Sequence, residues 1–448
     1  MSQAPIKILH LTPHLGTGVG AVVLNYLDQV KADGRFQHSL VCLDYANDLA
    51  KASAIVIGFA LQDKMAERPE QLLDLIAEAD IVLVHWWNHP LLSDFLIRHT
   101  LPASRIIFWS HVTGMPAPNN YTPKMLSYPD KMVFTTPLSL QLPEVKSLAS
   151  QMPNHFSAIW STGGSERLAW LKLKPHQGFN IGYIGSLDPA KLHPDFLALC
   201  AQVKIPEAHF IVVGGPNDRS ESLGAEVARS GLADKFTFTG FVSEEEKWRL
   251  LSTFDVFAYP LAAHHYGSSD QILQEAMSVG LVPVVFNNPM ESLMVDQGYA
   301  GVIAHSPSAY VEALENLYHN PILREQLSVS AKNYALGNYS VAKMEKQWND
   351  LFVETLRLPK TEKKWSLPLV QEQITAKDIF LESLGDYGQP FLEYCAATDE
   401  SSKERATSAI KDLAKSPNWR SVSKGTAHQY HNFFPTDEHL ALWSSWMH

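Results

Sequence analysis

The stretch that decides the fold is residues 255–286, which read DVFAYPLAAHHYGSSDQILQEAMSVGLVPVVF. The apolar runs near its two ends, at 256–259 and 281–286, have the length and composition of buried strands. Between them, a Gly-Ser-Ser-Asp cluster leads into an amphipathic helix whose apolar positions include Leu273 and Met277. A strand, a helix and a second strand in this order predict a βαβ unit with parallel strands.

The same alternation of apolar runs and helical patterns covers most of the chain. The runs are continuous and rich in β-branched residues, which is typical of parallel strands covered on both faces. They lie at 6–14, 38–45, 80–87, 105–112 and 131–136, and again at 179–185, 209–215, 235–240, 255–260, 281–286 and 300–305. The pattern predicts an α/β protein with doubly wound parallel sheets.

Glycine, serine and proline collect near residues 160–178, where we place a hinge between two domains of similar size. We expect a first Rossmann-like domain at 1–170 and a second at 171–338, facing each other across a central cleft. Residues 339–358 are expected to form a closing helix that crosses back to the first domain. Residues 359–448 lack strand-like runs and predict a mostly helical appendage that packs against the body or contacts a partner.

The bulk composition excludes several classes of protein. With 46% hydrophobic and 19% charged residues, the 448-residue chain is expected to fold and not to be disordered. Its formal net charge of −11 argues against a nucleic-acid-binding groove, and it does not indicate a peripheral membrane contact. The start MSQAPIKILHLTP has no signal-like segment, and Cys42, Cys200 and Cys395 read as reduced thiols, so we expect a cytoplasmic protein. Composition does not define the oligomeric state.

In open α/β sheets, ligands bind beyond the carboxyl ends of the strands. After the first strand, a loop with Gly16, Gly18 and Gly20 opens a helix. Glycines there allow a ligand to approach the backbone, and the helix N-terminus attracts negative charge. Lys191 follows the strand at 179–185, where its charge can neutralise a diphosphate. The alternatives are a tight turn without a ligand and a solvated lysine.

Asp270 and Glu275 lie at the start of the helix in the opening stretch. Asp270 occupies a plausible N-cap position, and Glu275 follows about one and a half turns later. Carboxylates beside a helix N-terminus suit a ligand that carries both phosphate and hydroxyl groups. The alternative is that Asp270 only caps the helix and that Glu275 is an exposed surface residue.

These motifs together resemble a known family. QEAMSVGLVPVV (274–285) resembles the EAMxxGxPVV signature of GT-B nucleotide-sugar glycosyltransferases of family 4, the retaining group 1 class. GYIGSLDPAK (182–191) and FIVVGGP (210–216) continue the resemblance in the second domain, and FWSHVTG (108–114) and the glycine loop are similar in the first. The similarity covers roughly residues 5–355. It implies a GT-B fold.

The resemblance also implies roles for single residues. Glu275 is expected to hold the nucleotide ribose, and Lys191 the donor diphosphate, with Gly185 in the same phosphate loop. The backbone around Phe241 and Val242 corresponds to the base-binding edge.

In the first domain, the resemblance places His111 opposite the donor sugar. It places Gly18 and Gly20, with Gly16 in the same loop, near the transferring phosphate and the acceptor.

Two positions depart from the family pattern. The position of the first Glu of the family's EX7E motif is Gly267 in this chain, so that carboxylate is missing. The stretch YGSSDQILQEAM resembles a divergent subgroup with the pattern YGTxE. That resemblance implies that Asp270, beside Ser268 and Ser269, supplies the missing carboxylate. Many relatives carry a phosphate-binding Arg where this chain has Ser186.

The implied activity is that of a retaining hexosyltransferase. It would move a sugar from a nucleotide-diphosphate sugar to a saccharide or lipid-linked acceptor in surface polysaccharide or glycoconjugate synthesis. His111, Asp270 and Lys191 are the expected catalytic residues. The sequence contains no Asp-x-Asp pair, so we expect neither a metal nor another cofactor.

Two alternatives remain open. One is a GT-B sugar-nucleotide epimerase, which would use first-domain histidines such as His85, His89 and His111. The other is a catalytically weakened GT-B scaffold that binds nucleotide or glycan, which the residues at Gly267 and Ser186 favour.

Overall fold

The computed structural model describes residues 4–16, 18–367 and 374–447. The chain forms two compact units. The first unit consists of Met1–Gly163 and Met344–His448, and the second unit consists of Gly164–Lys343. The second unit begins seven residues before the expected division at 170/171 and ends five residues after the expected division at 338/339. The expected appendage after residue 358 belongs to the first unit.

The first unit contains a seven-stranded sheet in the order β3-β2-β1-β4-β6-β7-β8. All its neighbouring strands are parallel. They are β1 (Ile6–Thr12), β2 (Phe36–Cys42), β3 (Leu61–Gln62), β4 (Ile81–Trp86), β6 (Ile106–Ser110), β7 (Lys131–Phe134) and β8 (Phe156–Ala158). The strand order reverses between β1 and β4, as in a doubly wound fold.

Helices and a small second sheet complete the first unit. The helices before the second unit are α1 (Gly18–Val30), α2 (Asp48–Ile57), α3 (Pro69–Glu78), α4 (Pro90–Arg98), α5 (Pro123–Ser127) and α6 (Pro143–Ala149), with 3-10 helices η1 (Met65–Glu67) and η2 (Pro137–Gln141). The boundary between the units falls within α14 (Val341–Thr355). The strand β15 (Thr361–Lys363) then pairs antiparallel with β5 (Leu101–Ser104).

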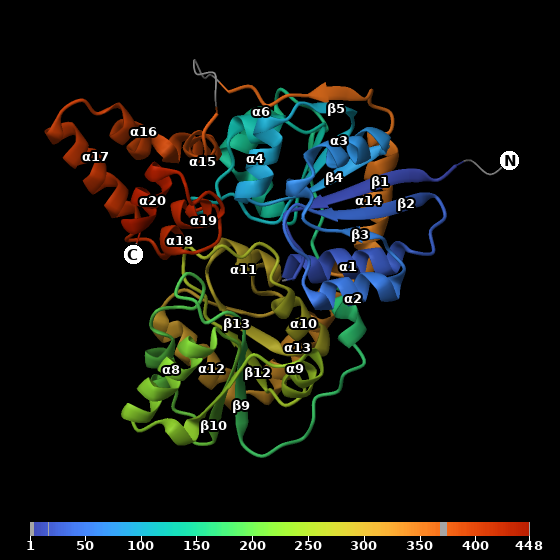
Figure 1. Cartoon of the computed structure of the whole chain (residues 1–448). Helices are drawn as coiled ribbons and strands as arrows, with labels where there is room; N and C mark the ends of the chain where they lie inside the picture. The colour runs from blue at the N-terminus through green and yellow to red at the C-terminus, as the bar shows by residue number, and fades with distance from the viewer. Residues whose placement is uncertain (1–3, 17, 368–373, 448) are drawn as a thin grey trace. The chain divides into compact units, whose positions relative to one another are not determined.

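The C-terminal helices share one core with the first sheet. They are α15 (Ala376–Leu384), η6 (Gly385–Gly388), α16 (Gln389–Ala396), α17 (Glu400–Leu413), α18 (Pro417–Arg420), α19 (Ala427–Phe433) and α20 (Glu438–Ser445). The buried side chains of Phe380 and Trp443 belong to the same apolar cluster as Leu9 of β1 and Phe108 of β6. The expected helical appendage is therefore present, and it packs against the body of the first unit (Figure 1, red).

The second unit contains a six-stranded parallel sheet in the order β11-β10-β9-β12-β13-β14. Its strands are β9 (Phe179–Ile184), β10 (Ala208–Val213), β11 (Phe236–Gly240), β12 (Val256–Tyr259), β13 (Val282–Phe286) and β14 (Val302–Ala304). Its helices are η3 (Ser165–Leu168), α7 (Phe196–Gln202), α8 (Asn217–Arg229), η4 (Ala233–Lys235), α9 (Glu244–Leu251), α10 (Gln271–Val279), α11 (Pro289–Met294), η5 (Asp296–Gly298), α12 (Pro307–His319) and α13 (Pro321–Asn338). The order reverses between β9 and β12.

The opening stretch forms the predicted βαβ unit from β12 through α10 to β13. The helix α10 ends at Gly280, whose φ of 91° is favourable for glycine and whose N–H bonds to the carbonyls of Ala276 and Met277. Both strands are buried along their length, as their continuous apolar sequences predict. Within the described ranges of the chain, we find no helix that is long and apolar enough to span a membrane.

Candidate functional site

The candidate site of the second unit lies where the strand order reverses, just beyond the carboxyl ends of β9 and β12. The loop after β9 is fastened to the chain that leaves β12. The carbonyl of Lys191 accepts a hydrogen bond from Ala262 N–H at 2.8 Å, and Leu192 forms an antiparallel bridge with Leu261. This backbone pairing fixes the position from which the Lys191 side chain projects.

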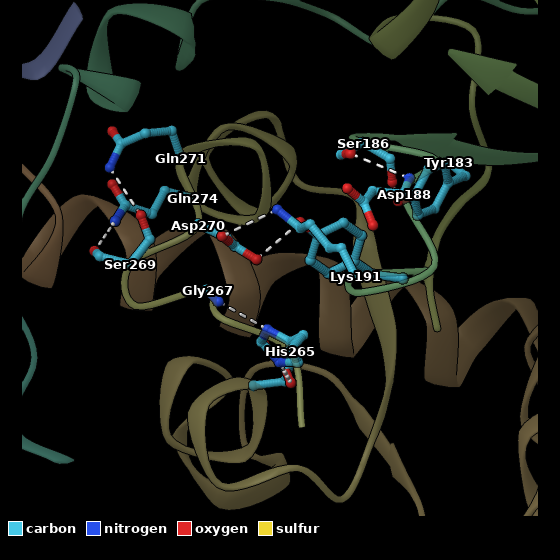
Figure 2. Close-up of polar contacts among 12 residues, drawn as sticks. Tyr183, Ser186, Asp188, Lys191, His265, Gly267, Ser269, Asp270, Gln271 and Gln274 are labelled. Carbon is cyan, nitrogen blue, oxygen red and sulfur yellow. Dashed lines mark hydrogen bonds and ion pairs between the residues drawn. The ribbon is translucent and has the colours of Figure 1, made fainter. Parts of the chain in front are cut away.

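Lys191 and Asp270 meet at this point as a buried ion pair (Figure 2). Lys191 Nζ lies 3.3 Å from Asp270 Oδ1, and the Tyr259 hydroxyl at the end of β12 donates to Asp270 Oδ2 at 2.9 Å. The two charged side chains are only 12% and 10% exposed. Lys191 Nζ also lies 5.7 Å from the centre of the Tyr259 ring, over its face.

Lys191 and Asp270 stabilise each other's charged form, and the Tyr259 hydroxyl also stabilises the Asp270 carboxylate. Burial alone would raise the pKa of Asp270, but the Lys191 ammonium and the Tyr259 hydroxyl outweigh it and hold that pKa below its usual value. Burial opposes the charge of Lys191 as well, yet Asp270 raises the lysine pKa above its ordinary value. A cation and an acceptor are therefore present side by side at neutral pH.

Asp270 occupies the N-cap position of α10, but its side chain makes no capping hydrogen bond. The alternative in which Asp270 merely caps the helix is therefore wrong. Its carboxylate instead turns to the Lys191 ammonium and the Tyr259 hydroxyl. The helix N-terminus and the ion pair thus lie next to each other.

The structure explains why position 267 is a glycine. A Cβ atom there would lie 2.9 Å from His265 Nδ1 and 3.0 Å from Asp270 Oδ1, both closer than ordinary contact. His265 is fixed, since its Nδ1 accepts from Gly267 N–H at 3.0 Å (Figure 2). Its Nε2 lies 2.9 Å from Glu291 Oε2. A glutamate at position 267 has no room while Asp270 holds this place.

Glu275 is buried and is not the exposed surface residue of the alternative reading, since it is 9% exposed. Its two carboxylate oxygens lie 3.1 Å and 2.8 Å from Lys247 Nζ of α9. Burial raises the pKa of Glu275, and the Lys247 ammonium offsets part of that shift. Glu275 belongs to a second ion pair, separate from that of Lys191 and Asp270.

The other predicted residues around α10 take part in local contacts. The hydroxyl of Ser269 accepts from Gln274 Nε2 at 2.9 Å, and Ser268 is half-buried. In the loop after β9, the hydroxyl of Ser186 accepts from Asp188 N–H at 3.2 Å (Figure 2).

Gly185 follows β9 directly, and the predicted base-binding edge follows β11. The Gly185 carbonyl approaches Gly214 so closely that a Cβ atom on Gly214 would lie 1.9 Å from its oxygen. Phe241 is 72% exposed at the end of β11, its ring lies against Gly215, and Val242 beside it is half-buried. An exposed aromatic face at a strand end is available for stacking on a base.

The predicted residues of the first unit lie at the carboxyl edge of its own sheet. Gly18 begins α1, and Gly20 lies in its first turn. A Cβ atom on Gly16 would lie 2.8 Å from Asn47 Nδ2, whereas one on Gly18 would meet no described atom within 4 Å. His111 follows β6 directly and is half-buried.

Sequence reasoning missed three partners in the second unit, namely Tyr259, Lys247 and His265. Tyr259 could have been found, because it ends the first predicted strand of the opening stretch, and ligands bind beyond the carboxyl ends of such strands. Lys247 stands in an acidic helix start, SEEEK, and gives no comparable signal. Over the residues for which coordinates are described, no group of three or more His, Cys, Asp or Glu side chains could hold a metal ion.

Comparisons with known proteins bear on this site. Residues 166–334 match the family model described as glycosyl transferases group 1. A stretch of 93 residues is 33% identical to 2-deoxystreptamine N-acetyl-D-glucosaminyltransferase of Streptomyces fradiae, covering 20% of this chain and 22% of that protein.

Solved structures resemble this chain over a greater length. HepE of Anabaena, solved with UDP, has 15% identity and a TM-score of 0.63 over 78% of this chain and 100% of its own. A glycosyltransferase of Rickettsia africae has 12% identity and a TM-score of 0.64 over 79% of this chain and 100% of its own. The chain therefore has the GT-B fold, and most of its second unit matches the glycosyl transferases group 1 family.

Proposed function

We propose that this protein is a retaining hexosyltransferase of family 4 that uses a nucleotide-diphosphate sugar as its donor. The observation that carries the proposal is the buried pair of Lys191 and Asp270, placed at the strand-order switch point and at the N-terminus of α10. This pair lies in the part of the chain that matches the glycosyl transferases group 1 model. The family match and the site chemistry therefore support the same activity.

The chemistry of the pair fits the departure of a nucleotide diphosphate. Negative charge develops on the leaving diphosphate, and Lys191 and the N-terminus of α10 supply fixed positive charge for it. Asp270 then accepts hydrogen bonds from sugar hydroxyls, while Tyr259 keeps its carboxylate oriented. We propose that this protein-borne cation makes the reaction independent of a metal ion, as the absence of an Asp-x-Asp pair from the sequence also suggests.

Glu275 and Phe241 extend the site to the nucleoside. Glu275 would accept from the ribose hydroxyls, sharing its carboxylate with Lys247, and the exposed ring of Phe241 would border the base. The Anabaena neighbour was solved with UDP and with UDP-glucose, which supports a donor of the same class here. From the first unit, His111 and the glycine loop would meet the sugar and a saccharide or lipid-linked acceptor, in a cytoplasmic step of polysaccharide or glycoconjugate synthesis.

The test is donor turnover in the presence of a chelator. UDP-, GDP- and ADP-linked hexoses are supplied with saccharide acceptors, and nucleotide release and the anomeric configuration of the product are measured. We expect one donor to be used with retention, and Lys191→Ala to lower kcat/KM by roughly 100-fold or more, the scale of one lost charge-stabilising group. Lys346→Ala, at a lysine whose side chain is 79% exposed on α14, is the matched control and should leave the rate unchanged.

The other possible results would contradict the proposal in different ways. An isomerised nucleotide sugar would identify an epimerase. Nucleotide binding without turnover of any donor would identify a scaffold. A rate that depends on added divalent metal would contradict the metal-free part of the proposal.

A further inference from the structure

A buried histidine and a buried glutamate hold the loop between β12 and α10 from the side of β13. His265 lies in this loop, and Glu291 lies in the first turn of α11, which follows β13. The strands β12 and β13 are neighbours in the sheet, so the segments beyond their carboxyl ends meet. His265 Nε2 lies 2.9 Å from Glu291 Oε2, and the two side chains are only 3% and 0% exposed.

A second contact joins the same two segments. The side-chain amide of Asn288, at the N-cap of α11, donates to the backbone carbonyls of Leu261 and Ala262 at 3.3 and 3.4 Å. The loop is therefore fastened to the β13 side just after it leaves β12. This contact keeps the backbone that carries His265 in reach of Glu291.

The hydrogen bonds of the His265 ring define which of its nitrogens carries the proton. The backbone N–H of Gly267 points to Nδ1 at a distance of 3.0 Å (Figure 2). A backbone N–H can only donate, so Nδ1 accepts and carries no proton. The ring proton is therefore on Nε2, which donates to Glu291 Oε2.

Glu291 makes the His265 ring a better acceptor for the loop. Hydrogen bonds in a chain polarise one another, so a carboxyl oxygen that accepts from Nε2–H strengthens Nδ1 as an acceptor. The bond at one ring nitrogen also sets the tautomer and the orientation of the ring. Glu291 thus acts on Gly267 through His265.

Gly267 in turn packs against the carboxylate of Asp270. A Cβ atom on Gly267 would lie 3.0 and 3.1 Å from the two oxygens of Asp270, so the backbone at this position lies directly against them. Lys191 and Tyr259 hold the same two oxygens by hydrogen bonds. The carboxylate therefore keeps its place only while Gly267 stays where its N–H bonds to His265.

We propose that His265 and Glu291 are positioning residues that hold Gly267, and through it the Asp270 carboxylate, where that carboxylate meets the donor sugar. Neither residue contacts the reacting atoms in this assignment. The meeting with a sugar rests on the proposed function. The tautomer of His265 and its effect on Asp270 do not.

The first test uses NMR spectra of the full-length protein labelled with ¹⁵N, without substrate. Long-range ¹H–¹⁵N correlations report the ring tautomer, and a ¹⁵N–¹⁵N coupling across the hydrogen bond identifies the partner of Nδ1. We expect His265 to be protonated at Nε2 alone and its Nδ1 to couple to the Gly267 amide. A proton on Nδ1, or a Gly267 amide coupled to no ring nitrogen, would overturn the proposal.

His265→Asn and His265→Leu form a matched pair, because the two side chains have nearly the same shape. Only the asparagine side chain can accept from the N–H two residues further on, as in an Asx-turn. We expect the carboxyl ¹³C signal of Asp270 to stay in place in the Asn variant and to shift in the Leu variant. We expect kcat per folded protein to fall about tenfold in Leu, the scale of one hydrogen bond, and to be rescued in Asn.

Glu291→Gln and Glu291→Leu test the outer partner in the same way. The glutamine oxygen can still accept from Nε2–H of His265, whereas leucine leaves that N–H buried without an acceptor. We expect the coupling between His265 and Gly267 to persist in Gln and to weaken in Leu, with kcat following the coupling.

Affinity for the nucleoside diphosphate, which carries no sugar, should stay nearly the same in all four variants. An Asp270 signal that does not move in His265→Leu would contradict the positioning role. So would equal kcat in the two His265 variants, or a loss of nucleotide affinity that matches the loss of kcat. The expected spectra in a protein that turns over no donor would refute only the proposed function.

Discussion

The glycine at position 267 offers a sensitive test of the site geometry. In Gly267→Ala, the new Cβ atom would lie 2.9 Å from His265 Nδ1 and 3.0 and 3.1 Å from the two oxygens of Asp270. Neither side chain can retreat freely, because His265 is held by Glu291 and Asp270 is held by Lys191. Relief requires one of these contacts to lengthen, and overpacking of this kind costs about 1–3 kcal/mol.

Gly224→Ala in the same unit is the matched control. A Cβ atom there meets only Phe238 at 3.8 Å, which is ordinary contact, and Gly224 lies within α8. Replacing a helical glycine by alanine stabilises by about 0.5–1 kcal/mol. The free energies of unfolding of the two variants should therefore differ by about 2 kcal/mol or more. Chemical denaturation followed by circular dichroism measures that difference.

Gly267→Glu adds the carboxylate that the group 1 pattern has at this position. It should be less stable than Gly267→Ala, because a second carboxylate would stand beside Asp270. A Gly267→Ala protein as stable as Gly224→Ala would refute the packing argument. A stable Gly267→Glu protein with raised donor turnover would refute the claim that Asp270 replaces the missing glutamate.

Three further predictions concern single side chains. Asp270→Asn leaves the Lys191 ammonium buried without its anion and should cost about 3 kcal/mol near neutral pH in denaturant unfolding. In the unaltered protein, the pKa of Asp270 is lower in the folded than in the unfolded state. Its stabilisation is therefore fully present above the unfolded pKa and is lost as the pH falls through the folded pKa. If Asp270→Asn left the loss of stability at acid pH unchanged, this reasoning would be wrong. Glu275→Gln should weaken binding of the cognate nucleoside diphosphate by roughly tenfold but leave its 2′,3′-dideoxy analogue unaffected, and equal losses in calorimetry would remove the ribose assignment. Alkylation of the native protein followed by peptide mass spectrometry should label Cys395, which is exposed, and spare Cys42 and Cys200, which are buried. Labelling of all three would mean that the buried thiols become accessible readily.

Much of the fold could be predicted from the sequence. The long apolar runs all became strands of the two parallel sheets, because continuous β-branched sequences suit strands buried on both faces. The strands that escaped prediction are short, namely Leu61–Gln62, Leu101–Ser104, Phe156–Ala158 and Thr361–Lys363. They have two to four residues each, too few to show a periodicity.

The site could be predicted only in part. The rule that ligands bind beyond the carboxyl ends of strands drew attention to Lys191 and Asp270, and the structure brings them together because β9 and β12 are neighbours. The contact of Glu275 with Lys247 depends on how α9 packs beside α10, which no local pattern encodes. Asp270 occupies the expected N-cap position, but the alternative in which it only caps the helix is wrong, because its side chain makes no capping hydrogen bond and pairs with Lys191 instead.

The alignment of the histidines in the first unit could not be predicted either. His10, His38, His85 and His111 each lie in a separate apolar run, and their alignment depends on the relative register of four strands. Register is set by side-chain packing across the whole sheet, so a single sequence does not reveal it.

The most direct test of the central claim is the calorimetric binding of UDP, GDP and ADP to the full-length protein in the presence of EDTA. The account predicts that one of them binds without metal and that Lys191→Ala weakens this binding, whereas Lys346→Ala leaves it unchanged. Failure of all three to bind, or binding that is indifferent to Lys191, would contradict a nucleotide-diphosphate site at the strand-order switch of the second unit.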